Sequence, residues 1–248
     1  MPRRRSRTLR DWRQWDAGCV TRADRDRALA DSRRALFVMA GVIAVLWAVQ
    51  VANSLDHYGL SRHFGIVARE PARLPDVFTA PLLHWSFSHI EANSVPLFFL
   101  GFFAAYRGIR RFIVVTVLIV VVSGLGSWLF SPSRTVSAGA SGVVFGYFGY
   151  VVVRGLVERR VLDVVVGLVV LATYWSILQG VLPEDPHISW QAHLFGLIGG
   201  IGAALLFRRP AALAKPRSDR RADRPPTASS SAESRAALYK ELDDHGLG

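Results

Sequence analysis

Apolar residues crowd into the segment 35–207, whereas charged residues concentrate in the first 34 and the last 41 positions of the chain. The 248 residues are 51% hydrophobic and yet carry a formal net charge of +11. A soluble domain of this size rarely combines the two properties. The separation predicts a membrane domain at 35–207 between a basic N-terminal segment, 1–34, and a C-terminal tail, 208–248. The tail is rich in Pro, Ser and alternating charge, which predicts disorder.

Six segments within the apolar region are candidates to cross a bilayer, which takes about 20 apolar residues for each helix. The first is too long for a signal-peptide core, so it is predicted to remain as an anchor. The sequence therefore predicts an all-α membrane protein with a six-transmembrane-helix bundle. The segments are 35–55, 89–106, 112–130, 139–153, 161–182 and 190–207.

Loop charges predict the orientation of these spans. With the N-terminus inside, 26 of the 30 Lys and Arg residues fall on inside segments and 4 fall on outside loops. The inside total counts Arg154, Arg159 and Arg160 as one basic loop. By the positive-inside rule, both termini are predicted to be cytoplasmic. The outside loop 56–88 is predicted to be interfacial and partly inserted.

The basic N-terminal segment admits a second reading as a nucleic-acid-binding arm, since Arg3, Arg4 and Arg5 lie close to Trp12. No nucleic-acid-binding motif follows, and an apolar stretch begins directly after Arg34. Topology anchoring is therefore favoured, and no nucleic-acid partner is expected. Cys19 is the single cysteine, which excludes an intrachain disulfide framework.

Polar residues inside membrane spans are costly and are therefore candidates for a functional site. The spans that carry them at 89–106, 139–153 and 190–207 all run from outside to inside in the predicted topology. The side chains should therefore meet near the outer ends of their helices. These residues are His89, Glu91, Asn93, Ser141, Gln191 and His193.

Helical spacing predicts how two of these spans approach each other. His89 and Asn93 are four residues apart and share one face. Glycines recur on one face of each of the spans at 139–153 and 190–207, and small residues let membrane helices come close. This contact would bring His193 within reach of Ser141. The glycines are Gly142, Gly146 and Gly149 in one span and Gly196 and Gly200 in the other.

The predicted cluster suits nucleophilic catalysis, because a serine hydroxyl needs an adjacent base to remove its proton. Ser141 would be the nucleophile and His193 the base. Asn93 and His89, with the backbone N–H of Ser141, would stabilise an oxyanion. Glu184 lies with Asp185 in the preceding loop, so a Ser–His dyad is expected rather than a triad.

These motifs resemble those of the rhomboid family of intramembrane serine proteases. The GxSG motif is Gly139 to Gly142, and the HxxGxxxG motif begins at His193 and includes Gly196 and Gly200. The pattern of His followed by Asn four residues later is His89 and Asn93, with His84 as a further matching histidine upstream. The fragment GxSG is weak alone, but three motifs on alternate spans are specific together.

The resemblance implies a six-helix core, a central span that carries the nucleophile Ser141, and an active site that opens to the outer face. It also implies cleavage of single-span membrane proteins within the lipid bilayer of a bacterial cell. Two features depart from the family pattern. The first outside loop lacks the Trp-Arg pair of many members, and Glu91 is unexpected in an apolar helix. Glu91 is expected to face away from the site, towards Arg73 or the interface.

Other classes fit the sequence less well. No HExxH string is present, and a metal site built from His84, His89 and His193 would lack an acidic ligand, so no metal or cofactor is expected. The α/β-hydrolase signature GxSxG fails because Val143 follows Gly142. A catalytically dead relative usually lacks the Ser or the His, and a transporter should show two related halves, which the sequence does not.

Overall fold

The computed structural model describes residues 22–106, 108–158, 161–183 and 189–208, together with positions 235 and 244. Cys19, Glu184 and nearly all of the tail from 209 onwards lie outside the described residues. Long helices account for most of the described part. They are α1 (Arg22–Leu55), α3 (Phe87–Ala105), α4 (Ile109–Phe130), α5 (Ser141–Glu158), α6 (Val161–Tyr174) and α7 (Trp190–Leu206).

Each predicted span has a helix at its place in the chain, and α6 continues into a 3-10 segment, η4 (Trp175–Val181). Among the described residues, four helical segments are long and apolar enough to cross a membrane, namely those of α1, α4, α5 and α6 with η4. α7 is a shorter apolar helix. α3 contains polar residues and Pro96.

α1 begins at Arg22, earlier than the predicted residue 35, because charge ends a membrane span without ending a helix. Residues 22–34 are mainly Arg, Ala and Asp; Arg and Ala are strong helix formers, and the segment has no Pro or Gly. Arg34 and Asp31 form an exposed i,i+3 ion pair at 3.7 Å. The helix therefore continues through the basic segment and into the apolar one.

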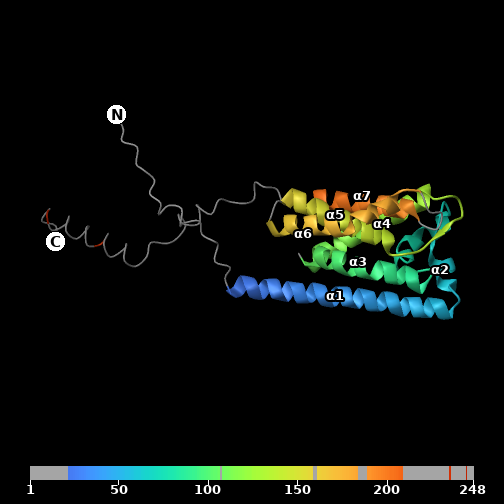
Figure 1. The fold of residues 1–248 in the computed structure, drawn as a ribbon, viewed down its shortest axis with the longest axis horizontal. Helices are drawn as coiled ribbons and strands as arrows, with labels where there is room; N and C mark the ends of the chain where they lie inside the picture. The colour runs from blue at the N-terminus through green and yellow to red at the C-terminus, as the bar shows by residue number, and fades with distance from the viewer. Residues whose placement is uncertain are drawn as a thin grey trace, which may run out of the picture. The chain divides into compact units, whose positions relative to one another are not determined.

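α5 is the central helix of the bundle. It packs against α3, α4, α6 and α7, whereas α1 packs mainly on α3 and lies at the edge (Figure 1). In the most apolar stretch of α5, 67% of the residues are buried, compared with 22% in that of α1. Its neighbours therefore shield α5 from lipid more completely than they shield α1.

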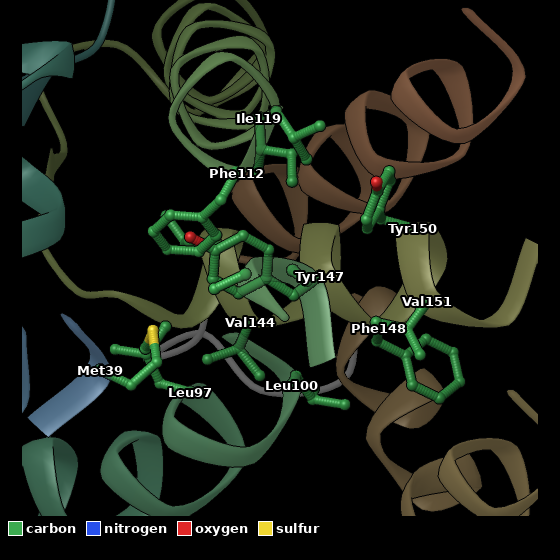
Figure 2. Close-up of a cluster of buried hydrophobic side chains, with 14 of the residues drawn as sticks. Met39, Leu97, Leu100, Phe112, Ile119, Val144, Tyr147, Phe148, Tyr150 and Val151 are labelled. Carbon is green, nitrogen blue, oxygen red and sulfur yellow. The ribbon is translucent and has the colours of Figure 1, made fainter. Parts of the chain in front are cut away.

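A cluster of buried side chains joins α5 to its neighbours (Figure 2). Tyr147 stacks on Phe112 of α4 with ring centroids 5.7 Å apart, and its hydroxyl lies 2.6 Å from the Thr116 hydroxyl. Met39 from α1 and Leu97 from α3 belong to the same cluster. The cluster thus draws four helices together.

Glycine backbones form the contact between α5 and α7. A Cβ atom on Gly196 would overlap the carbonyl of Gly142, and one on Gly200 would overlap the carbonyl of Gly146. A Cβ atom on Gly149 would lie 3.0 Å from the Leu197 carbonyl oxygen. The helices therefore touch through their main chains, as the glycine spacing predicted.

The segment between α1 and α3, which the loop charges predict to lie outside, is a folded cap rather than a plain linker. It contains α2 (Gly59–Phe64), β1 (Ile66–Val67), η2 (Pro71–Val77) and η3 (Ala80–Leu82). β1 pairs antiparallel with β2 (Val136–Ser137), with Ile66 opposite Ser137 and Val67 opposite Val136. The cap is therefore bonded to the chain just ahead of Ser141.

Arg73 links separate parts of the cap through its guanidinium group. Its guanidinium pairs with Asp76 and donates to the carbonyl oxygens of His63 and Gly65. Glu91 is exposed on α3, facing out as expected. The suggested approach of Glu91 to Arg73 is wrong, because Asp76, three residues further along the same 3-10 segment, is the carboxylate that Arg73 binds.

Arg154 corrects one part of the predicted loop charges. Its side chain is 1% exposed and pairs with Asp163, also 1% exposed, at 3.5 Å. It further donates to the Phe103 carbonyl oxygen at 3.2 Å. Arg154 is therefore part of the helix packing and not of a basic loop, because Asp163 neutralises it inside the protein. Arg159 and Arg160 lie outside the described residues.

The α5–α7 contact predicts different effects for two glycines of the same helix. Gly200→Ala should lower the free energy of unfolding by about 1–3 kcal/mol, because its Cβ would overlap main-chain atoms. Gly202→Ala is the matched control, since nothing lies within 4 Å of a Cβ there. Thermal unfolding in detergent measures both, and equal midpoints for the two variants would contradict the close backbone contact.

Candidate active site

Ser141 is the first residue of α5 and is held at the helix start by a turn that requires glycine. Gly139 has φ +148°, a conformation that residues with a side chain rarely adopt. A Cβ atom there would also lie 2.9 Å from His89 Cε1. The Gly139 N–H donates to the Ala80 carbonyl oxygen of the cap at 3.0 Å. The turn therefore places Ser141 at a fixed position beside His89.

His193 of α7 contacts Ser141 directly. Its Nε2 lies 2.7 Å from Ser141 Oγ, and its Nδ1 lies 2.8 Å from the Gly180 carbonyl oxygen. A carbonyl can only accept, so Nδ1 carries the hydrogen and Nε2 accepts from the serine hydroxyl. The Phe145 ring stacks on the imidazole, with centroids 4.1 Å apart and an interplanar angle of 10°. The imidazole is thus held at both nitrogens and on one face.

Two serine hydroxyls and one glutamine amide hold the first turn of α7 in place by hydrogen bonds. Ser189 caps the helix by accepting from the Ala192 N–H at 3.4 Å. Ser123 of α4 donates to the Ala192 carbonyl oxygen at 2.8 Å. Gln191, predicted from its place in a span, donates to the Phe130 carbonyl oxygen at 3.4 Å. These bonds position the residue next to Ala192, which is His193.

The predicted oxyanion donors occupy the first two turns of α3. Ser86 caps α3 by accepting from the His89 N–H at 3.0 Å. The His89 ring borders Gly139, and so lies next to Ser141. Asn93 is 7% exposed, and its amide donates to the His89 carbonyl oxygen at 3.1 Å within its own helix. The geometry thus brings the His89 ring to the turn and keeps Asn93 one helical turn away.

His84 forms a hydrogen bond to the turn that precedes Ser141. Its Nε2 accepts from the Ala140 N–H at 3.3 Å, and its ring packs edge-on against the His89 ring at 5.0 Å. The side chain is completely buried. Burial, with His89 close by, lowers the pKa of His84 to about 3 from an ordinary 6.5. His84 is therefore neutral, as its role as an acceptor requires.

Asn53 and Ser61 fix His84 in turn, and the sequence analysis missed both. Asn53 donates to the His84 carbonyl oxygen at 2.8 Å and to Ser61 Oγ at 2.8 Å. Ser61 Oγ also reaches the His84 carbonyl at 3.3 Å. The available signal was the polar side chain of Asn53 in an otherwise apolar helix. Gly180 and Phe145 had no comparable signal.

A cavity lies beside Ser141, between the cap, the second half of α4 and the first turns of α5 and α7. Its wall mixes the hydroxyl groups of Ser123, Ser127 and Ser189 with apolar side chains such as Val77. A hollow of this kind can receive part of a ligand. Within the described residues, no group of three His, Cys, Asp or Glu side chains could hold a metal ion.

Comparisons with known proteins show which family the chain resembles. The family profile described as Rhomboid domain matches residues 71–210. An uncharacterized protein of Mycobacterium tuberculosis is 38% identical over 176 residues, covering 68% of this chain and 73% of the relative. The putative rhomboid protease YdcA of Bacillus subtilis is 29% identical over 130 residues, covering 50% and 62%. The rhomboid protease GluP of Bacillus subtilis is 30% identical over 138 residues, covering 55% and 26%.

The neutral His84 predicts how stability depends on pH. Between pH 6.5 and about 3 the unfolded chain binds a proton at His84 that the native protein does not, so stability falls as the pH falls. At pH 5 this loss should be about 2 kcal/mol relative to pH 7.5. His84→Gln cannot titrate, so its unfolding midpoint should drop less between these two pH values.

His63→Gln is the matched control, because His63 is exposed on α2. That variant should keep the pH dependence of the wild type. Thermal unfolding of all three proteins at pH 7.5 and pH 5 provides the comparison. An identical drop in the wild type and in His84→Gln would contradict a buried neutral His84.

Proposed function

The chain belongs to the rhomboid family, and from this premise we propose that it hydrolyses peptide bonds of single-span membrane proteins, with Ser141 as nucleophile and His193 as general base. Family membership and two relatives named as rhomboid proteases support a protease. The family and the apolar helices also support an integral membrane protein. The observation that carries the assignment of residues is the 2.7 Å contact between His193 Nε2 and Ser141 Oγ.

The first half of the proposed reaction forms an acyl-enzyme. Ser141 Oγ attacks the carbonyl carbon of the scissile bond while its proton moves to His193 Nε2. The tetrahedral intermediate then collapses, the C–N bond breaks, and His193 gives the proton to the departing amine. In the second half, a water molecule attacks the ester, its proton passes through His193, and Ser141 is regenerated.

Three donors are proposed for the oxyanion. The Ser141 N–H lies in the first turn of α5, where backbone N–H groups lack helical partners and favour negative charge. The His89 ring lies beside the same turn. The Asn93 amide has two N–H groups, so it can keep its bond to the His89 carbonyl and donate the second to the oxyanion. Gly139 and Gly142 support the site by giving it room.

The proposed setting is a six-span protein of the bacterial cell membrane with both termini in the cytoplasm. The described spans carry exposed apolar side chains on α1, α4 and α6, as lipid-facing helices do. The cavity beside Ser141 is small and suits one side chain of an extended substrate segment. A membrane substrate would therefore have to unwind locally before Ser141 could reach its backbone.

Ser141→Ala should abolish cleavage of a single-span model substrate in liposomes, a loss of about 10⁴-fold or more, because no nucleophile remains. Ser54→Ala is the control, since that hydroxyl bonds to its own helix in α1 at the Val51 carbonyl. Cleavage by both variants is measured on gels after equal unfolding midpoints are verified. Undiminished cleavage by Ser141→Ala would exclude the proposed nucleophile.

A fluorophosphonate probe should label Ser141, and labelling should fall by about 10²-fold or more in His193→Ala, because the hydroxyl loses its base. His63→Ala removes an exposed histidine and should label like the wild type. Mass spectrometry identifies the modified residue, and gel fluorescence gives the rates. Equal labelling of wild type and His193→Ala would argue against His193 as the base.

A further inference from the structure

The 3-10 segment η4 supplies the second hydrogen-bond partner of His193. The carbonyl oxygen of Gly180 lies 2.8 Å from His193 Nδ1, on the side of the ring opposite Ser141. This bond decides which nitrogen carries the hydrogen, and only a ring protonated at Nδ1 leaves Nε2 able to accept from Ser141. Catalytic triads use a carboxylate or amide side chain for this task. Here a main-chain carbonyl performs it.

Gly180 also lacks the atom that would disturb the ring. A Cβ atom at this position would lie 3.0 Å from Phe145 Cζ and 3.1 Å from His193 Nδ1, both tighter than ordinary contacts of a Cβ atom. Among the described glycines, only Gly108 and Gly139 have a φ in the positive range. An alanine at 180 is therefore compatible with the backbone, and only the space around the stacked rings excludes it.

We propose that Gly180 is a positioning residue of the protease: its carbonyl holds His193 in the productive tautomer, and its missing side chain admits the Phe145–His193 stack. This inference rests on the proposed function. Gly180 touches neither the nucleophile nor a reacting atom, so it acts through His193. The three groups form a stack from η4, α5 and α7, and the stack sets the direction in which Nε2 points.

The location of Gly180 gives this role a structural consequence. η4 contains no buried residue, and only 17% of the residues in the most apolar stretch of α6 and η4 are buried. Apart from its own helix, η4 packs mainly on α7, the helix that carries His193. The catalytic imidazole is thus aligned by one of the least buried segments of the described protein, and a displacement of η4 would release Nδ1.

The decisive comparison uses three glycine-to-alanine variants. Gly180→Ala should lower kcat by about 10²-fold with little change in KM, because a small misplacement of a catalytic group has effects of this size. Gly202→Ala, where nothing lies within 4 Å, should stay within about twofold of the wild type. Gly155→Ala is a control for general destabilisation, since its Cβ would lie 2.6 Å from the Asp163 carbonyl oxygen at the far end of α5.

Gly155→Ala should lower the unfolding midpoint while the folded fraction keeps the wild-type kcat. If Gly180→Ala shows that same pattern, the role of Gly180 is structural and the inference is wrong. If wild type neither cleaves the substrate nor reacts with the fluorophosphonate, the proposed function itself fails. A wild type that labels, together with a Gly180→Ala variant that labels equally fast, overturns only the inference.

Two further measurements test the mechanism directly. ¹⁵N NMR of histidine-labelled protein, with His193 assigned by its absence in His193→Gln, should show hydrogen at Nδ1 in the wild type and a tautomer mixture in Gly180→Ala. In a Phe145→Leu background Cζ is absent, so Gly180→Ala should lower kcat by a smaller factor there than in the wild type. An unchanged His193 tautomer, or strictly additive effects of the two substitutions, would overturn the inference.

Discussion

The main-chain contact between α5 and α7 is the constraint on which the site depends. Lipid is as apolar as a leucine side chain, so helices in a bilayer associate through close packing rather than through the exclusion of water. Gly196 and Gly200 lie directly on the carbonyls of Gly142 and Gly146. At this separation the first turns of the two helices are so close that an imidazole on one reaches a hydroxyl on the other. A side chain at Gly196 or Gly200 would force the two helices apart.

A second principle, the satisfaction of buried polar groups, arranges everything around that pair. Gly180 occupies one nitrogen of His193, Ala140 occupies one nitrogen of His84, and Asn53 bonds the His84 carbonyl. Each bond joins a side chain to the main chain of another element. In an apolar surrounding an unmade bond of this kind costs more than in water, so the partners are held in place. The cap contributes a bond between main chains, from the Gly139 N–H to the Ala80 carbonyl oxygen.

The sequence predicted the helices and the pair at the centre of the site because both follow from local patterns. Apolar length fixed the spans, and glycine spacing placed Ser141 opposite His193. The helix α1 begins at Arg22, ahead of the predicted span, because hydropathy reports where a helix meets lipid and not where it begins. Gly180 could not be predicted, because a carbonyl group is present at every residue and only the fold selects one. Arg154 was misassigned because its partner Asp163 lies in the next helix.

That buried pair also limits how the chain can change over generations. Arg154 and Asp163 are each 1% exposed, and removing one partner would leave a charge enclosed in the protein, at a cost of about 3–5 kcal/mol. Replacing both by apolar residues of similar size can be nearly neutral. A mutational path from the charged pair to an apolar pair passes through a single variant that folds poorly. The two positions should therefore be inherited together, as a unit that drifts only by paired substitution.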